Sequence, residues 1–292
     1  MFAVNFNKMT MPVFYGKVAL IDFLNTIKPL RSTVGFVPTM GALHDGHLSL
    51  MQRSQAENAI TVVSIFVNPT QFNNPEDLLK YPRTLEQDVE KIAALNPDIL
   101  IYAPSVEDVY EGKILSQPFN FDGLENQMEG KFRPGHFDGV GTIVKRLFEI
   151  VNPTTAYFGE KDYQQLLIVE KMVEKAQLTV KVIGCPIHRE ANGLAMSSRN
   201  ERLSKSEREE AKIIFEILTE AKEKFKNTTA EEVSLWVTET FKTNKMFELE
   251  YFQIADAHTL LPCENKIANQ KYRAFIAVLV NNIRLIDTIS LN

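Results

Sequence analysis

The sequence predicts an α/β protein with a Rossmann-type, doubly wound parallel sheet and a smaller C-terminal α+β domain. Apolar, β-branched strand patterns alternate with helical patterns from residue 34 to residue 185, as in repeated βαβ units. A strand, a glycine-containing turn and a helix recur, first in FVPTMGALHDGH (36–47) and again in TTAYFGEKDY (154–163). The alternation stops after His188. We therefore expect one domain at 1–186 and a second at 187–292.

The strand and helix patterns of the first domain follow one another in a regular order. An amphipathic helix at 17–28 ends before Pro29, and the run ITVVSIFVN has the β-branched composition of a strand buried on both faces. Residues 112–141 lack periodicity and contain several glycines, which is typical of a lid or binding loop. The expected strands lie at 34–37, 60–68, 98–103 and 179–185, with a further short strand that ends at Gly159, and the expected helices lie at 47–59, 84–95, 142–151 and 163–176.

The second domain begins with a polar stretch, REANGLAMSSRNERLSKSE, that has no strand period. Helical patterns follow at 205–226 and 230–243, and strand patterns at 249–256, 272–280 and 283–289. Asn281 and Asn282 separate the last two strands, and two asparagines favour the positive φ angles of a tight hairpin turn.

Composition and charge exclude several classes of protein. The chain of 292 residues has 32 Lys and Arg against 37 Asp and Glu, a formal net charge of −5, which argues against a nucleic-acid binder. Cys185 and Cys263 are far apart, so neither a disulfide framework nor a zinc knuckle is indicated. Neither a signal peptide nor an apolar run long enough for a membrane span is present, and we expect a cytoplasmic protein without membrane contact.

The turn after the first strand carries His44 and His47 and leads into a helix. A helix N-terminus presents unpaired N–H groups and the positive end of the helix dipole, so it attracts phosphate, and imidazole groups can add further donors. The same residues also fit a plain turn with two solvated histidines. Zinc binding is disfavoured because no third ligand has a familiar spacing.

Two other turns present groups suited to an anionic ligand. Lys161 lies in GEKD (159–162) at a helix N-terminus, where an ammonium adds charge to the backbone donors, although a solvated turn explains the same residues. Gln71 follows the strand at 60–68, at the edge where open α/β sheets bind ligands. GVGTIV (139–144) lacks the third glycine of a dinucleotide loop and indicates the start of a packed helix.

Six blocks in order and spacing resemble the pantoate–β-alanine ligase family: FVPTMGALHDGH, FVNPTQF, YPRTLEQD, RPGHFDGV, FGEKDYQQL and REANGLAMSSRN. The resemblance covers roughly residues 30–292 and is strongest before Asn200. It implies membership of the nucleotidylyltransferase superfamily, in which 44–47 is the HIGH-like motif and MSSR (196–199) is the counterpart of the KMSKS loop. It also implies a homodimer that acts in pantothenate and coenzyme A biosynthesis.

The implied reaction is an ATP- and Mg²⁺-dependent ligation in two steps. The carboxylate of pantoate attacks the α-phosphorus of ATP to give pantoyl adenylate and pyrophosphate, and the amine of β-alanine then displaces AMP to form pantothenate. The chemistry needs positioning and stabilisation of negative charge, which imidazole, ammonium and guanidinium groups supply.

The resemblance carries functional roles onto individual positions of this chain. His44, His47, Lys161 and Arg199 are the implied catalytic residues, and Gln71 and Gln165 the implied pantoate and β-alanine contacts. Asp88 and Arg133 match positions near the pyrophosphate, Mg²⁺ and lid. The implied ATP-binding positions are Met40, Gly41, Ala42, Leu43, His44, Asp45, Gly46, His47, Gly159, Glu160, Lys161, Asp162, His188, Met196, Ser197, Ser198 and Arg199.

Two positions depart from the family pattern. Gln87 stands where some members have a second acidic residue beside Asp88, which leaves Mg²⁺ to be held mainly by phosphate oxygens. His188 stands where a small apolar residue next to adenine is common.

Three other functions fit parts of the sequence. The first is a nucleotidylyltransferase with another acceptor, but an anionic acceptor calls for basic residues in place of Gln71 and Gln165. A class I aminoacyl-tRNA synthetase is disfavoured by the chain length and acidic balance. A nucleotide-binding regulatory module without turnover is disfavoured because His44, His47, Lys161 and Arg199 are all present.

Overall fold

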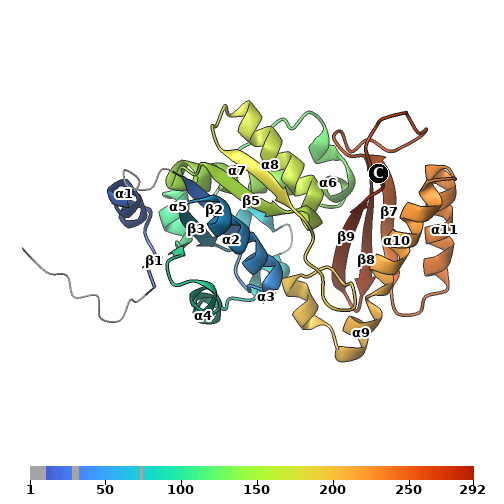
Figure 1. The fold of residues 1–292 in the computed structure, drawn as a ribbon, viewed down its shortest axis with the longest axis horizontal. Coiled ribbons are helices and arrows are strands. Elements are labelled where there is room, and N and C mark those ends of the chain that lie inside the picture. The colour runs from blue at the N-terminus through green and yellow to red at the C-terminus, as the bar shows by residue number, and fades with distance from the viewer. Residues whose placement is uncertain (1–10, 28–32, 73–74) are drawn as a thin grey trace, which may run out of the picture. The chain divides into compact units, whose positions relative to one another are not determined.

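The computed structural model describes residues 11–27, 33–72 and 75–292, which form two compact units (Figure 1). The expectation about a signal peptide falls largely on residues 1–10, outside the described residues. The first unit contains the chain up to Phe119 together with Gly135–Phe158 and Met172–Gly184. The second contains Asn120–Pro134, Gly159–Lys171 and Cys185–Asn292.

A six-stranded parallel sheet in the order β1-β4-β3-β2-β5-β6 is the framework of the first unit, as predicted. Consecutive strands run outward from β2 through β3 to β4, and the order then reverses to β5 on the other side of β2. This reversal is the topological switch point of a doubly wound sheet. The strands are β1 (Val13–Phe14), β2 (Val34–Thr39), β3 (Ile60–Ile65), β4 (Leu100–Tyr102), β5 (Thr155–Gly159) and β6 (Lys181–Cys185).

Neighbouring residues of β2 show how helices cover both faces of this sheet. A Cβ added at Gly35 would lie 2.1 Å from Ser54 Oγ of α2 (Asp45–Glu57), whereas the ring of Phe36 lies 6.1 Å from that of Phe148 in α7 (His136–Val151). Because successive side chains of a strand point to opposite faces, α2 and α7 lie on opposite sides. The sheet is therefore buried on both faces, as the β-branched run of β3 indicates.

The helices of this unit largely follow the expected order, although α7 starts earlier than expected and the short helices α3 and α5 were not predicted. Helix α7 begins at His136 rather than at Thr142, and its early residues Phe137 and Val140 are buried. The short edge strand β1 was not predicted either. The elements are α1 (Lys17–Ile27), α2 (Asp45–Glu57), η2 (Pro69–Gln71), α3 (Pro75–Lys80), α4 (Leu85–Leu95), α5 (Val106–Tyr110) and α7 (His136–Val151).

The second unit is built on an antiparallel sheet of β7 (Glu248–Asp256), β8 (Tyr272–Val280) and β9 (Ile283–Ser290). Asn281 and Asn282 have φ angles of 44° and 63°, so the predicted hairpin is confirmed. The helix expected at 205–226 is interrupted at Ala211 and Lys212 and forms two helices. The other elements are η3 (Leu124–Asn126), α6 (Met128–Phe132), η4 (Glu160–Asp162), α8 (Tyr163–Lys175), η5 (Ser198–Arg202), α9 (Lys205–Glu210), α10 (Ile213–Phe225) and α11 (Ala230–Lys242).

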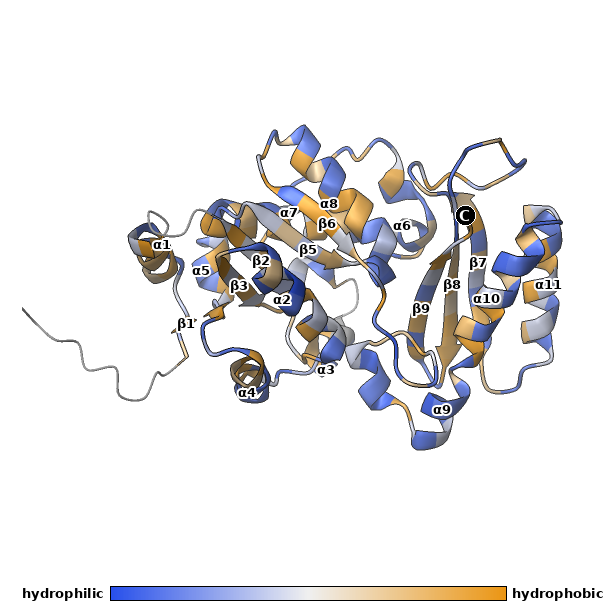
Figure 2. Ribbon diagram, in the orientation of Figure 1, coloured by the Kyte–Doolittle hydropathy of each residue, from blue (hydrophilic) through white to orange (hydrophobic). Residues whose placement is uncertain are grey.

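Both faces of this small sheet are covered within the second unit. One face packs on α10 and α11 through Tyr272, Ala274, Ile276 and other core residues, and Figure 2 shows hydrophobic residues recurring along both helices. The alternate residues of β8 face away from this core. Arg273 and Phe275 contact Glu160 and Tyr163, which belong to the earlier segment 159–171. The second unit thus recruits chain segments from before residue 185.

The last change from one unit to the other lies between Gly184 and Cys185, two residues before the predicted boundary. Two earlier segments, 120–134 and 159–171, group with the second unit. The division into continuous domains 1–186 and 187–292 therefore remains a prediction.

Candidate functional site

The histidine turn lies at the carboxyl end of β2, beside the switch point of the sheet. His44 is the N-cap residue of α2, and its backbone N–H donates to His47 Nδ1 at 3.3 Å. The two imidazole rings lie 4.0 Å apart between centroids. Because Nδ1 of His47 accepts, a neutral His47 ring carries its proton on Nε2. The turn therefore presents an N–H donor from a ring fixed at a helix N-terminus.

The backbone before His44 has an uncommon conformation. Gly41 has a φ of 82° and Ala42 a φ of 49°, both in the left-handed region. Asp88, which is fully buried in the first turn of α4, accepts hydrogen bonds from the N–H groups of Ala42 at 2.9 Å and Leu43 at 2.8 Å. The sequence indicated Asp88 only as a position near the phosphates, and the structure places its carboxylate under this turn.

Gln71 lies in η2, immediately after β3, where it is half-buried. His136 Nδ1 donates to the carbonyl oxygen of Gln71 at 2.9 Å, and the side chain of the buried Asn68 donates to Gly139 O at 3.2 Å. The N-terminal part of α7 thus holds η2 at the edge of the sheet. His136 and Gly139 were not recognised from the sequence as supports of this turn.

Lys161 lies in η4, in the second unit, and η4 packs against β9. Arg273 of β8 forms an ion pair with the neighbouring Glu160 at 2.6 Å, and its guanidinium stacks over Tyr163 at 4.0 Å from the ring centroid. Lys161 Nζ lies 3.7 Å from an Asp162 carboxylate oxygen. The small sheet therefore anchors the turn that carries Lys161 on both sides, at Glu160 before the lysine and at Tyr163 after it.

The MSSR segment ends a hairpin that spans residues 188–196 and also packs near β9. Arg189 pairs in a bidentate manner with the buried Asp287 of β9 at 2.6 and 3.0 Å. Ser197 is the N-cap residue of η5 and accepts from Arg199 N–H at 3.2 Å, and Asn200 donates to Glu190 at 2.8 Å. These contacts fix the backbone from which Ser197, Ser198 and Arg199 extend.

Two adjacent glutamines of α8 differ in what surrounds them. Gln164 is buried, accepts from Glu129 N–H and donates to the carbonyl oxygens of Leu124 and Gln127. Gln165 is only half-buried. Gln164 thus holds the segment 120–134 in place, whereas the family pattern makes Gln165 the expected ligand contact.

The segment 120–134 carries Arg133 and is tied to the small sheet by Glu129. Glu129 pairs with Arg284 of β9 at 2.7 and 2.8 Å and accepts from the Tyr251 hydroxyl at 2.8 Å. Burial lowers the pKa of Arg133. The negative charge of Glu129 raises this pKa, but the positive charges of Arg199 and Arg284 lower it, and the net shift is downward. The second unit therefore gathers a group of cationic side chains that includes Arg133 and Arg199.

The sequence alone did not identify Lys91, Glu129, Arg284 or Asp287 as supports of the candidate site. Arg284 and Glu129 are 155 positions apart, and Asp287 and Arg189 are 98 apart. Local patterns carry no signal of such pairings. Lys91 belongs to the amphipathic helix α4, and its ammonium donates to the carbonyl oxygen of Leu43, a contact that only the fold creates.

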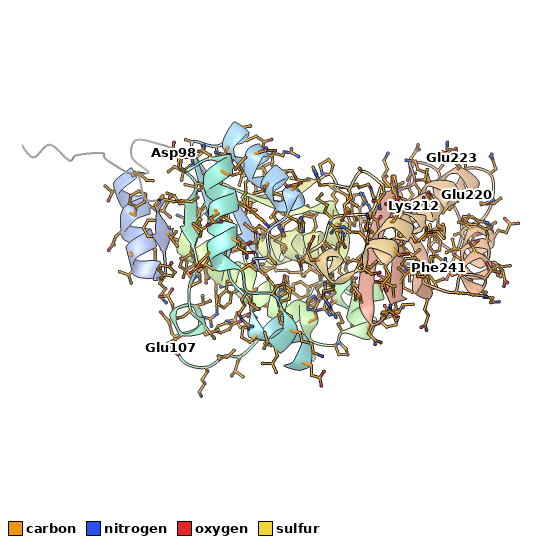
Figure 3. The ribbon with its side chains drawn as sticks, turned by 90° about the horizontal axis from the view of Figure 1, so that it is seen from below. Asp98, Glu107, Lys212, Glu220, Glu223 and Phe241 are labelled. Atoms are coloured by element: carbon orange, nitrogen blue, oxygen red, sulfur yellow. The ribbon has the colours of Figure 1, made fainter. Side chains whose placement is uncertain are left out.

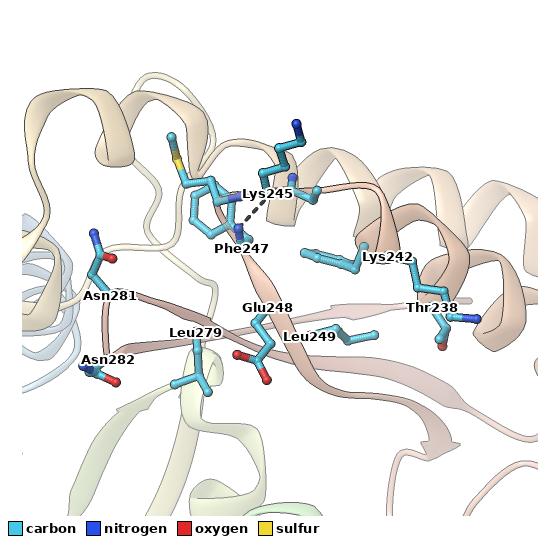
Figure 4. A pocket seen from close by; sticks show the side chains of 12 residues that line it. Thr238, Lys242, Lys245, Phe247, Glu248, Leu249, Leu279, Asn281 and Asn282 are labelled. Atoms are coloured by element: carbon cyan, nitrogen blue, oxygen red, sulfur yellow. Dashed lines mark hydrogen bonds between the residues drawn. The ribbon is translucent and has the colours of Figure 1, made fainter.

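A metal site made of protein ligands is not found among residues 11–27, 33–72 and 75–292, where no three His, Cys, Asp or Glu residues are suitably grouped. In the same ranges, none of the helices has the length and apolar character needed to span a membrane. A pocket of the second unit, between the end of α11 and the β8–β9 turn, includes Lys245, Phe247 and Asn281 in its lining (Figure 4). It contains none of the predicted site residues.

Comparisons with known proteins agree on one family. Residues 15–290 match the family model described as "Pantoate-beta-alanine ligase". The chain is 64% identical over 281 residues to a pantothenate synthetase of Flavobacterium psychrophilum, covering 96% of this chain and 100% of the relative.

Two solved structures are similar over nearly the whole chain. The pantothenate synthetase of Thermus thermophilus has a TM-score of 0.87 and 39% identity, covering 96% of this chain and 99% of the other. The pantoate–β-alanine ligase of Francisella tularensis, complexed with "Beta-gamma ATP" and β-alanine, has a TM-score of 0.78 and 37% identity, with coverages of 97% and 98%.

Proposed function

We propose that this chain, which belongs to the pantoate–β-alanine ligase family and joins pantoate to β-alanine in an ATP-dependent, amide-forming ligation, does so through pantoyl adenylate. A carboxylate is a poor acyl donor until one of its oxygens becomes part of a good leaving group. In the first step pantoate attacks the α-phosphorus of ATP and pyrophosphate leaves. In the second step the amine of β-alanine attacks the acyl carbon and AMP leaves.

The observation that carries this proposal is the pair of histidines, with ring centroids 4.0 Å apart, at the N-terminus of α2 and at the switch point of the sheet. We assign His44 and His47 to the α-phosphate, where the negative charge grows in the transition state. The Nε2–H of His47 and the backbone N–H groups of the helix N-terminus stabilise this charge. Met40 and the turn 41–46 form the nucleotide side of the same site.

We assign the neutral glutamines Gln71 and Gln165 to pantoate. Pantoate is a small hydroxy acid with hydroxyl groups that need hydrogen-bond donors and acceptors, and a side-chain amide supplies both. The firm support of η2 by His136 and Asn68 suits a residue that must orient its substrate.

We assign the cationic and hydroxyl groups of the second unit to the β- and γ-phosphates. Lys161, Arg199, Ser197 and Ser198 supply an ammonium, a guanidinium and two hydroxyl donors, and Arg133 adds a further positive charge. Residues that line the nucleotide are proposed to be Gly159, Glu160, Asp162, His188 and Met196.

Mg²⁺ is proposed to accompany ATP through the phosphate oxygens. The described residues do not form a protein cage for the ion, and both oxygens of Asp88 accept hydrogen bonds from the protein. Mg²⁺ prefers to keep several water ligands and to bind phosphates directly, so a site held by the nucleotide suits it. We therefore do not propose Asp88 as a Mg²⁺ ligand.

The central test is an AMP-forming assay with purified protein, ATP, Mg²⁺, D-pantoate and β-alanine. We expect AMP and pyrophosphate in equal amounts, and pantoate-dependent exchange of labelled pyrophosphate into ATP in the absence of β-alanine. Exchange without pantoate, or AMP formation only with a different acid, would contradict the proposed substrate. Absence of exchange together with normal ligation would contradict the adenylate.

Replacing either histidine tests the role at the α-phosphate. We expect His44→Ala and His47→Ala to lower kcat by about 10²-fold or more, as the loss of one transition-state donor does. Isothermal titration should show that ATP still binds. A variant that loses ATP affinity while kcat is unchanged would refute the assignment.

We further propose a cytoplasmic homodimer, as the family resemblance implies. Light scattering at assay concentration should then give twice the chain mass of 33.2 kDa. A monomer mass would refute the dimer without affecting the proposed reaction.

A further inference from the structure

Helix α4 presents two charged side chains to the turn that precedes His44. The carboxylate of Asp88 accepts hydrogen bonds from Ala42 N–H at 2.9 Å, Leu43 N–H at 2.8 Å and the Thr84 hydroxyl at 3.1 Å. Asp88 is fully buried. These three donors occupy both oxygens of the carboxylate, and hydrogen bonds to an ionised acceptor are stronger than neutral ones.

Lys91 lies three residues after Asp88, on the same side of α4. Its ammonium donates to the carbonyl oxygen of Leu43 at 2.6 Å. Asp88 therefore holds the N–H group of Leu43, and Lys91 holds its carbonyl group. The peptide that links Leu43 to His44 is thus fixed immediately before the first histidine.

This turn needs such support because its backbone conformation is unfavourable. Ala42 has a φ of 49°, in the region that residues with a Cβ rarely adopt. A Cβ added at Gly41, where φ is 82°, would lie 3.1 Å from Asp88 Oδ2 and 3.2 Å from Ile65 Cγ2. The turn is therefore tightly packed on Asp88, and a relaxed turn would move the start of α2.

We propose that Asp88 and Lys91 are positioning residues that hold the 41–43 turn in its left-handed conformation and so set the place of His44, and that Asp88 does not ligate Mg²⁺. The importance of this placement for turnover rests on the proposed function. A buried carboxylate with three protein donors has no room for the water shell that Mg²⁺ retains.

The test compares Asp88→Asn with Glu86→Gln, a matched control in which an exposed carboxylate of the same helix turn is replaced. The asparagine is isosteric but puts an NH₂ group against a backbone N–H. Hydrogen exchange is measured by mass spectrometry in EDTA, without nucleotide. We expect the amides of residues 42 and 43 to exchange at least tenfold faster in D88N than in wild type or E86Q. A metal ligand predicts no change, and unchanged exchange would overturn the proposal.

The second readout is the Mg²⁺ dependence of AMP formation at saturating ATP. We expect D88N to lower kcat at least tenfold and to leave the half-saturating Mg²⁺ concentration within twofold of wild type. Recovery of the rate at high Mg²⁺ would overturn the proposal. Should wild type itself form no pantoate-dependent AMP, the proposed function fails while the exchange measurement still decides the support of the turn.

Lys91→Met provides an independent variant if D88N does not fold, as judged by circular dichroism. It removes the ammonium and keeps most of the apolar stem. We expect faster exchange of the 41–47 peptide and a lower kcat, with an unchanged Mg²⁺ requirement. Exchange and kcat equal to those of wild type would overturn the role of Lys91.

Discussion

Gly139 is the residue at which α7 crosses the turn that carries Gln71. A Cβ at this position would lie 2.3 Å from the backbone oxygen of Thr70, which cannot move aside as a flexible side chain can. In an exposed helix an alanine is favoured over glycine by about 1 kcal/mol. Overpacking against a rigid neighbour costs about 1–3 kcal/mol. The close approach of α7 to Thr70 therefore explains the glycine at position 139, although alanine has the higher helix propensity.

We expect Gly139→Ala to lower the free energy of unfolding by about 2 kcal/mol and to raise the KM for pantoate, because η2 must shift. Urea denaturation and steady-state kinetics measure the two effects. Gly16→Ala is the control, since the nearest atom to its added Cβ lies at 3.7 Å, an ordinary contact. Equal free energies of unfolding for G139A and G16A would contradict this prediction, because η2 would then shift without any loss of stability.

At the scale of elements, the short helix α6 contacts the small sheet through the carboxylate of Glu129 and the ring of Phe132. Glu129 accepts from Arg284 and Tyr251, and the Phe132 ring stacks on Tyr251 at 5.5 Å. Burial alone raises the pKa of Glu129, but the hydrogen bonds and charge of Arg284, with the Tyr251 hydroxyl, outweigh it and leave the pKa below its ordinary value. The attachment is therefore strongest while Glu129 is ionised.

We expect Glu129→Gln to lower the free energy of unfolding by about 3 kcal/mol at pH 7, because it leaves Arg284 with one partner fewer in a poorly solvated place. A lowered pKa adds stability that is complete above the unfolded pKa, near 4.5, and is lost as the pH falls through the folded value. The difference between wild type and E129Q should therefore shrink below about pH 4, as denaturant melts at several pH values would show.

The control for this variant is Glu223→Gln on α10. Glu223, labelled in Figure 3, forms an ion pair with Lys226 in which both side chains are exposed. We expect E223Q to change the free energy of unfolding by less than about 0.5 kcal/mol, both at pH 7 and below about pH 4. A pH-independent effect of E129Q would mean that packing, and not charge, attaches α6.

At the scale of the whole molecule, the two units interleave along the chain. The core of the second unit lies between Leu194 and Leu291, but the opposite face of its sheet is covered by residues 120–134 and 159–171. Arg273 is buried, pairs with Glu160 and has its guanidinium stacked over the Tyr163 ring, and both partners belong to 159–171. A fragment that begins at the predicted boundary would keep the core and lose this cover.

We therefore expect residues 187–292 alone to fold cooperatively. We also expect Arg273→Met to change the free energy of unfolding less in this fragment than in the full chain. In the full chain this change leaves Glu160 without its ion-pair partner and should cost about 2–4 kcal/mol. In the fragment Arg273 faces water, and the same change should be nearly neutral. Thermal melts followed by circular dichroism compare the two. If Arg273→Met destabilised the fragment and the full chain equally, the residues that stabilise Arg273 would have to lie within 187–292.

Much of the fold follows from local patterns. Strand β8 and the Asn281–Asn282 turn have the predicted bounds, and β2, α4 and α11 differ by a residue or two at their ends. The sequence places the start of α7 too late because Gly139 and Gly141 resemble a loop, whereas in the structure Gly139 lets the helix pack against the backbone of Thr70. The histidine turn was found because glycine, histidine and a following helix are sequence neighbours.

The sequence by itself determined the alternation of strands and helices, the parallel sheet, the phosphate-suited turn and, through six ordered blocks, the family. These features depend on residues that are close in the chain. Only the tertiary structure decided that Asp88 faces the turn before His44, that Gln164 supports the segment 120–134, and that both faces of β8 are covered. Each of these depends on partners 35 to 113 positions away, whose pairing arises only when the chain is packed.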